Sequence, residues 1–390
     1  MNVRVKFLGG AKSVSGSRYL LEIDEHKIMI DCGLFQGLKE LRLRNWDEFP
    51  VPPEQIETVI LTHAHIDHIG YLPKLVKEGF KGRIYCTQPT EDLVKILLMD
   101  SAKLQEEEAL FAKKKGYSKH AEPKPLYDTK DAESVFPLLS SLHYKDTLKL
   151  NDHIKVRFHN AGHILGASSV EVILNGSSQE KRILFSGDIG RMEDPILYSP
   201  TLFEQADILF IESTYGDRDN PQGDHKKELS DTINRSLQRG GCLLIPAFAV
   251  GRTQLMLYFM KELIEEKLVP DIPVFIDSPM ATSVTELYRK YVEFHKLKEH
   301  HLGSNENAVF DYKNIQYRQS QAQSIQINEV RSGAVIISSS GMCTGGRILV
   351  GSRARIFSFF AQTHNVFQHD NCRIQHHPNG KRQPSQRYNI

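Results

Sequence analysis

The 390-residue sequence has few of the features that mark secreted or membrane proteins. No apolar run approaches the length needed to cross a bilayer, and the N-terminal residues lack the apolar stretch of a signal peptide. The five cysteines are scattered without close pairs, which argues against a disulfide framework and against a cysteine zinc site. We therefore expect a cytoplasmic protein without a membrane partner. The net charge of +1 does not exclude a polyanionic partner, because a basic groove can be local. The oligomeric state also stays open.

One short stretch is crowded with potential metal ligands. His63, His65, Asp67 and His68 fall within six residues, directly after the apolar run 59–61. In an extended strand, residues two apart point to the same side, so His63 and His65 can bind one ion together while Asp67 and His68 reach a second. Imidazole nitrogen combined with carboxylate oxygen suits zinc better than magnesium or calcium. A surface loop rich in histidine is the alternative interpretation, but this density behind a buried strand favours a metal site.

Three further carboxylate or imidazole groups follow predicted strands. Asp31 comes after an apolar strand at residues 26–30, and Asp188 comes after another at residues 183–185. His163 lies ahead of a glycine turn in the segment Asn-Ala-Gly-His-Ile-Leu-Gly. Together with the His cluster, these segments resemble, in their order, the metallo-β-lactamase superfamily, whose signature is H-x-H-x-D-H.

This resemblance implies both a fold and a set of zinc ligands. The fold would be the αββα sandwich of that superfamily, and Asp31 would orient a metal-bound imidazole. The resemblance implies two zinc ions: the first on His63, His65 and His163, the second on Asp67 and His68, with Asp188 as the bridge between them.

The second half of the chain has a different pattern of secondary structure, in which predicted helices alternate with short apolar strands. Such alternation predicts a parallel sheet covered by helices, and therefore a second α/β domain. We expect the first domain to span residues 1–210 and the second, a cap domain, to span residues 211–349. Helices are predicted at 224–239, 252–267 and 281–298, and strands at 242–245, 272–276 and 334–338.

Four phrases in this half narrow the resemblance to the β-CASP branch, the nucleic-acid-processing metallo-β-lactamases. They are Glu212-Ser-Thr-Tyr-Gly, Gly251-Arg-Thr-Gln, Asp277-Ser-Pro-Met-Ala and Ser340-Gly-Met-Cys-Thr-Gly-Gly-Arg. Within the branch the chain is similar to the RNA endonucleases related to the nuclease subunit of the cleavage and polyadenylation specificity factor. DNA-processing members usually carry Asp where this chain has Glu212. The resemblance implies zinc-dependent cleavage of phosphodiester bonds in single-stranded RNA.

The predicted chemistry assigns roles to further residues. Zinc lowers the pKa of a bound water from near 16 to about 7, and Asp67 would accept a proton from the attacking water. By resemblance, Glu212 would orient a catalytic histidine, so the predicted catalytic residues are Asp67, Glu212 and Asp31. Glycine-rich turns at the ends of parallel strands expose backbone amides that can bind phosphate. The predicted substrate-binding residues are Arg252, Ser278, Ser340 and Arg347.

The sequence departs from the family pattern after Leu349. Residues 350–390 contain no Leu, and they hold six Lys or Arg against one Asp. This composition predicts a disordered segment produced by truncation or a shifted reading frame. One ligand of the second zinc and the catalytic acid would then be missing, and activity would be impaired. A basic RNA-binding tail is the alternative interpretation.

Two other functions remain as hypotheses beside the ribonuclease. A metallohydrolase of small molecules would use the same zinc ligands, but it does not need a cap domain with phosphate-type turns. A catalytically inactive RNA-binding protein would be consistent with the unusual sequence after Leu349.

Overall fold

The computed structural model describes residues 2–116, 122–176, 179–219, 223–297, 309–341 and 347–348. The chain divides into two compact units. The first comprises residues 1–220, 249–262 and 279–313, and the second comprises residues 221–248, 263–278 and 314–390. The segment predicted to be a disordered tail, 350–390, lies outside the described residues. The boundary between the first domain and the cap domain, predicted at residue 210, stays a prediction.

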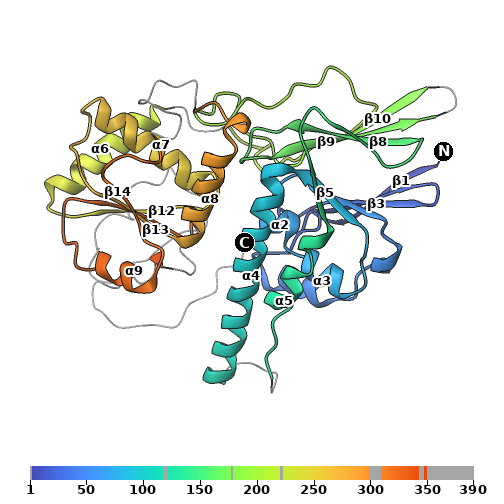
Figure 1. The fold of residues 1–390 in the computed structure, drawn as a ribbon, viewed down its shortest axis with the longest axis horizontal. Helices are drawn as coiled ribbons and strands as arrows, with labels where there is room; N and C mark the ends of the chain where they lie inside the picture. The colour runs from blue at the N-terminus through green and yellow to red at the C-terminus, as the bar shows by residue number, and fades with distance from the viewer. Residues whose placement is uncertain are drawn as a thin grey trace. The chain divides into compact units, whose positions relative to one another are not determined.

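The first unit contains a six-stranded sheet whose strands follow the order of the chain (Figure 1). β1, β2 and β3 pair antiparallel, whereas β3, β4, β5 and β6 pair parallel. Parallel strands need a crossover between them, and the segments between β3, β4, β5 and β6 provide it with short helices and the long α4 (Gln88–Lys115). The bounds are β1 Val3–Gly9, β2 Arg18–Ile23, β3 His26–Ile30, β4 Thr58–Ile60, β5 Arg83–Thr87 and β6 Leu139–Leu142.

A five-stranded sheet, in the order β11-β10-β9-β8-β7, forms the other half of this unit. Its strands pair antiparallel, except that β10 and β11 are parallel. The bounds are β7 Thr147–Lys149, β8 Ile154–Asn160, β9 Ser168–Asn175, β10 Glu180–Phe185 and β11 Ile208–Phe210.

The two sheets share one hydrophobic core. Alternate residues of β8, namely Ile154, Val156 and Phe158, are buried, as expected for a strand with one face turned inward. They belong to the same cluster as Leu21 and Ile60 of the six-stranded sheet. The predicted α/β sandwich is confirmed.

Helices accompany the six-stranded sheet. The longest, α4 (Gln88–Lys115), packs against α5 (Thr129–Glu133) and α8 (Pro279–Lys290), with α2 (Ile66–Ile69) and α3 (Leu72–Lys77) close by (Figure 1). The short helix α1 spans Lys39–Leu43, and single 3₁₀ turns occur at Arg44–Trp46, Pro53–Gln55, Phe136–Leu138 and Val292–Phe294.

The second unit is built on a four-stranded parallel sheet in the order β12-β15-β13-β14. The parallel pairing confirms what the alternation of helix and strand predicted. Phe275, Ile327 and Ile336 form the centre of its core. The bounds are β12 Leu243–Pro246, β13 Val274–Asp277, β14 Ile315–Tyr317, β15 Val335–Ser338, α6 His225–Gln238 and α9 Gln321–Ile327. Helix α7 (Arg252–Glu265) contributes residues to both units.

Several local predictions were wrong, each for a physical reason. The polar, proline-containing stretch 117–135 predicts a loop, but a reciprocal capping box between Asp128 and Asp131 starts helix α5 within it. The apolar spacing from Ile69 to Phe80 predicts one helix behind the His cluster, but α2 ends at Ile69, and α3 begins only at Leu72. The helix expected to reach residue 298 ends at Lys290. The short elements β6, β14 and α9 have too few residues for a clear periodicity and were not predicted.

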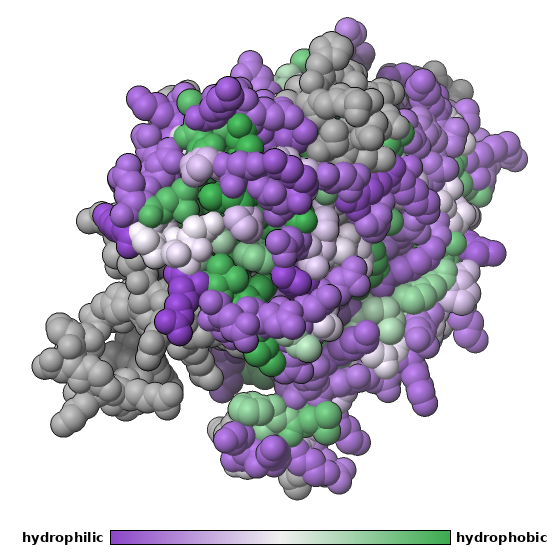
Figure 2. All heavy atoms as spheres, turned by 60° about the vertical axis from the view of Figure 1, so that its left-hand side comes forward, coloured by the Kyte–Doolittle hydropathy of each residue, from purple (hydrophilic) through white to green (hydrophobic). Residues whose placement is uncertain are grey.

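Polar side chains cover most of the face that Figure 2 shows, and hydrophobic ones gather in smaller patches. Among the described residues, no helix is both long and apolar enough to span a membrane.

The shared core makes a direct prediction about stability. We expect Phe158→Ala to lower the free energy of unfolding of the first unit by about 3–5 kcal/mol, because it removes a fully buried aromatic ring from between the sheets. The control is Leu202→Ala, since Leu202 is 77% exposed. Urea unfolding that gave equal losses for both variants would contradict the assignment of this core.

Candidate metal centre

The ligand-rich stretch leaves the sheet before its first histidine. β4 ends at Ile60, so His63 and His65 lie in a loop rather than in the extended strand that was expected. His65 directly precedes α2, and its backbone carbonyl accepts bonds from the amides of His68 and Ile69 at 2.8 and 3.0 Å. The tight first turn of α2 therefore places Asp67 and His68 directly after His65, with the His68 ring 4.0 Å from the His63 ring.

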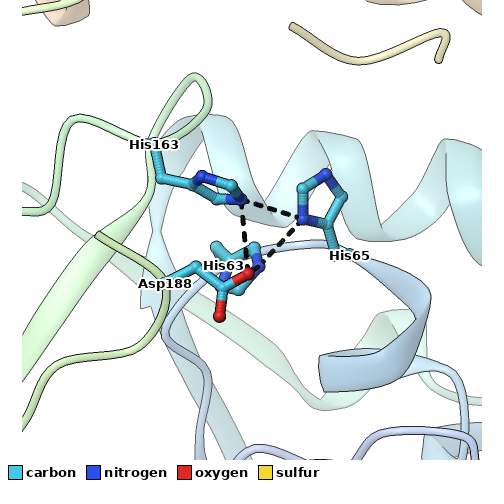
Figure 3. A group of neighbouring side chains, drawn as sticks. All are labelled: His63, His65, His163 and Asp188. Carbon is cyan, nitrogen blue, oxygen red and sulfur yellow. Dashed lines mark hydrogen bonds and ion pairs between the residues drawn. The ribbon is translucent and has the colours of Figure 1, made fainter. Parts of the chain in front are cut away.

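Four side chains each direct one ligand atom into the same small region, where these atoms all lie within 4.8 Å of one another (Figure 3). The four residues are His63, His65, His163 and Asp188. His63 Nε2 and His163 Nε2 lie 3.0 and 3.1 Å from His65 Nδ1. The Oδ2 atom of Asp188 lies 3.6 Å from His63 Nε2 and 3.4 Å from His163 Nε2. A zinc ion roughly 2.0–2.1 Å from four tetrahedral ligands holds them roughly 3.3–3.4 Å apart. The group therefore has the size and the donor atoms to bind a metal ion.

The second oxygen of Asp188 faces a second group of ligands. Oδ1 lies 3.3 Å from His68 Nε2, which in turn lies 3.9 Å from Asp67 Oδ2. One carboxylate thus has one oxygen toward the three histidines and the other toward His68 and Asp67. The bridging role expected for Asp188 stays a prediction.

The charges of the group agree with metal binding. Burial, followed by the nearby His68, holds the pKa of His63 well below its usual value. Burial, followed by His163, lowers the pKa of His65 to about 4. Burial by itself raises the pKa of Asp188, but the surrounding histidines, His63 foremost and then His68, hold it far below its usual range. Of these two, His68 is the one whose own pKa is raised and which therefore carries positive charge. Neutral imidazoles and an ionised carboxylate are the forms that bind metal ions.

The buried carboxylate of Asp31 forms hydrogen bonds with Thr62 in the ligand loop and lies against His68. It is almost fully buried and accepts hydrogen bonds from the Thr62 amide at 2.7 Å and the Thr62 hydroxyl at 2.8 Å. Its Oδ2 also lies 2.8 Å from His68 Nδ1, which leaves Nε2 of His68 turned toward Asp188. Burial lowers the pKa of His68, but Asp31 and Asp188 outweigh this and hold it well above its usual value. The structure thus places Asp31 against His68, and its role in orienting a metal-bound imidazole stays a prediction.

Arg18 supports the neighbouring loop, and sequence reasoning missed it. Its buried guanidinium lies over the rings of Tyr71 and Phe35, at 4.0 and 4.9 Å from their centroids. It donates from Nε to the Gly33 carbonyl at 2.7 Å and from Nη2 to Asn45 Oδ1 at 3.2 Å. Gly33 has no room for a side chain, because a Cβ there would lie 1.5 Å from the Asp67 carbonyl oxygen. The only signal in the sequence is an arginine at the start of the largely apolar segment 18–21.

Comparisons with known proteins agree with this geometry. Residues 20–211 match the model of a metallo-β-lactamase superfamily domain, and residues 253–351 match the model of a Beta-Casp domain. Over 351 residues, the chain is 34% identical to Ribonuclease TTHA0252 of Thermus thermophilus, which covers 89% of this chain and 75% of that protein.

The chain belongs to the β-CASP branch of the metallo-β-lactamase superfamily.

Other relatives are less similar or longer. The chain is 32% identical to the transcription termination factor FttA of Methanosarcina mazei over 361 residues, which cover 89% of this chain and 53% of that factor. It therefore spans about half the length of this relative. An RNase J-like protein of Methanocaldococcus jannaschii is 28% identical over 351 residues, with 89% of this chain and 73% of that protein covered.

Glu212, the first residue of the β-CASP phrases, lies beside the metal centre. Its amide donates to Ser186 Oγ at 3.0 Å, and its Oε1 accepts from the Ile189 amide at 3.5 Å. Ser186 and Ile189 flank the turn that carries Asp188, so Glu212 braces that turn. Its predicted role in orienting a catalytic histidine stays a prediction.

The predicted substrate-binding residues fall in both units. Arg252 is partly exposed at the start of α7 in the first unit. In the second unit, Ser278 is buried beside Ser339, and Ser340 is partly exposed. Arg347 donates to Asp277 Oδ1 at 3.0 Å and to the carbonyls of Arg318 and Gln319 at 2.9 and 2.7 Å. These bonds give Arg347 a structural role in that unit, and the four substrate-binding roles stay predictions.

The contacts of Asp31 predict a selective effect on metal binding. Asp31→Asn keeps the shape but removes the negative charge opposite His68 Nδ1, so we expect metal affinity at the position of His68 to fall about 10–100-fold. The position of His63, His65 and His163 should keep its affinity. Stepwise titration with zinc, followed by calorimetry, measures both. Equal weakening of the two positions would show that Asp31 does not act through His68.

Proposed function

We propose that this chain is a zinc-dependent ribonuclease that cleaves phosphodiester bonds in single-stranded RNA. The observation that supports it most directly is the pair of ligand groups joined by Asp188, in a chain of the β-CASP branch. The relative with 34% identity is named a ribonuclease, which supports RNA as the substrate.

Zinc is the metal that best suits the residues present. Three imidazoles and one carboxylate are ligands that zinc accepts readily, whereas magnesium and calcium prefer sites made almost wholly of oxygen. His63, His65 and His163 would hold the first ion, Asp67 and His68 the second, with Asp188 shared. Zinc ions, when bound, supply Lewis-acid chemistry that lowers the pKa of water and stabilises negative charge on a phosphate.

The side chains around the centre have different proposed roles in the reaction. Asp67 is 25% exposed and close to His68, so its carboxylate can accept the proton of a water that attacks the phosphate. Asp31 keeps His68 in one orientation, and Glu212 keeps the Asp188 turn in place. The proposed catalytic residues are therefore Asp67, Glu212 and Asp31, the last two as positioning residues.

Two parts of the proposal rest on the sequence alone. Cytoplasm is the proposed location. The expected impairment by the sequence after Leu349 concerns residues outside the described part of the chain and stays a prediction.

The first test is metal dependence. We expect the purified protein to contain at least one zinc per chain and the double variant His63→Ala/His65→Ala to lose the more tightly bound ion, because both imidazoles face the same point. Elemental analysis of protein purified without chelator measures this. His143→Ala/His153→Ala is the matched control, since both residues lie outside the cluster. Zinc-free wild-type protein would contradict the metal assignment.

The second test is the substrate. Zinc-loaded protein should cleave single-stranded RNA in preference to duplex DNA or small carboxylic esters, and Asp67→Asn should reduce the rate about 10²–10⁴-fold, as expected for loss of general base catalysis. Gel analysis of labelled RNA measures the rate. Faster hydrolysis of small esters would favour a small-molecule metallohydrolase instead. RNA binding without cleavage by zinc-loaded wild-type protein would favour an inactive RNA-binding protein.

A further inference from the structure

Two glycines pack against the loop that carries His163. The Gly190 amide donates to the Ala161 carbonyl at 2.8 Å, and a Cβ at Gly190 would lie 1.7 Å from the Gly162 carbonyl oxygen. On the other side, a Cβ at Gly251 would lie 3.4 Å from Ile164 Cγ2. All of these residues belong to the first unit. The chain on each side of His163 is therefore in close contact with a glycine.

An arginine follows each of these glycines. Arg191 comes directly after Gly190, three residues beyond Asp188, and Arg252 comes directly after Gly251. The contacts of the two glycines bring both arginines next to the segment 161–164. Two arginines from segments far apart in the sequence therefore lie next to the segment that carries His163.

The positive charge of Arg191 acts on Arg252. Burial, followed by this charge, lowers the pKa of Arg252, while Tyr215 and Asp194 act in the opposite direction. Within the described ranges, neither guanidinium has a hydrogen bond or an ion pair. Asp194 offsets part of the repulsion, but its Oδ1 already accepts the amides of Ile196 and Leu197, each at 2.8 Å. Two neighbouring positive charges, Arg252 partly buried and Arg191 exposed, are stabilised by an anion that binds both.

Phosphate is the anion that two arginines recognise best. The planar guanidinium donates two parallel hydrogen bonds to phosphate oxygens, and it loses less hydration than an ammonium group when it does so. The position beside His163 and Asp188 puts such an anion close to the metal ligands. A polynucleotide held at the metal centre carries further phosphates on both sides of the bond to be cleaved.

We propose that Arg191 and Arg252 together bind one backbone phosphate of single-stranded RNA beside the metal centre. The proposal rests on the proposed ribonuclease function and adds to it a specific phosphate subsite. Arg191 was not among the predicted substrate-binding residues, and Arg252 was predicted without a partner. Because both arginines would contact one phosphate, the contribution of each to RNA binding depends on the other. Arginines that contact separate phosphates would contribute independently.

Interdependence is the property to test. We expect Arg191→Ala and Arg252→Ala each to weaken binding of a phosphorothioate single-stranded RNA about 10-fold or more, the usual loss for a charge-assisted hydrogen bond. The double variant should lose less than the product of the two single losses, because both arginines contact one phosphate. The slope of log Kd against log salt should fall by about 0.7 in the double variant, the value for one single-strand phosphate.

Three controls keep these results specific. Arg331→Ala removes the same charge from an exposed position in the second unit and should leave the Kd nearly unchanged. Arg191→Lys and Arg252→Lys keep the charge but lose the paired hydrogen bonds, so they should restore binding only in part. Zinc content and melting temperature should match the wild type. If an alanine variant fails to fold, the lysine variants and Gln at the same positions take its place.

The outcomes separate this proposal from the ribonuclease itself. If the wild type cleaves RNA and both alanine variants bind RNA as Arg331→Ala does, the phosphate subsite is wrong while the ribonuclease stands. If the variants bind more weakly but with fully multiplicative losses, the arginines act separately and the joint site is wrong. If the wild type neither binds nor cleaves RNA, inorganic phosphate is the probe. Thermal stabilisation by phosphate that both alanine variants lose would support the anion site, and stabilisation that they keep would overturn it.

Discussion

The buried carboxylate of Asp31 is the interaction on which the site depends. Parallel pairing of β3 with β4 sets Ile30 opposite Ile60 and brings Asp31 to the start of the ligand loop. There it adopts a left-handed backbone conformation, with φ of 57°, which aspartate tolerates better than most residues. A buried carboxylate is costly unless it is hydrogen-bonded, and Thr62 with His68 satisfies it. The same bonds that make this charge tolerable also orient a ligand.

The centre requires both sheets of the sandwich. His63 and His65 follow β4 of the six-stranded sheet, whereas His163 follows β8 and Asp188 follows β10 of the other. A direct link joins the two sides, since both the amide and the hydroxyl of Ser168 donate to the Thr62 carbonyl, at 2.8 and 2.9 Å. A variant that loosens the core between the sheets should therefore affect metal binding as well as stability.

Much of the fold could be predicted from the sequence because hydrophobic periodicity is a local property. A long element with a regular pattern, such as α6, was predicted within a few residues of its ends, at 224–239 against His225–Gln238. The capping box of α5 was readable at Asp128 and Asp131 but was hidden in a polar stretch with little periodicity. β6 and β14 are strands only because they pair in parallel with strands far away in the chain. Such pairing leaves no local mark.

The sequence by itself determined which side chains can bind a metal, because residue type and spacing fix the chemistry of His63, His65, Asp67 and His68. Resemblance then supplied His163, Asp188 and their order. Only the tertiary structure decided which of these atoms face one another, since the ligand loop leaves the strand and turns into α2. Only the tertiary structure, too, brought Arg18 to the Gly33 carbonyl and placed Arg191 and Arg252 next to the segment that carries His163. These contacts join residues far apart in the chain, and no local pattern encodes the distance between them.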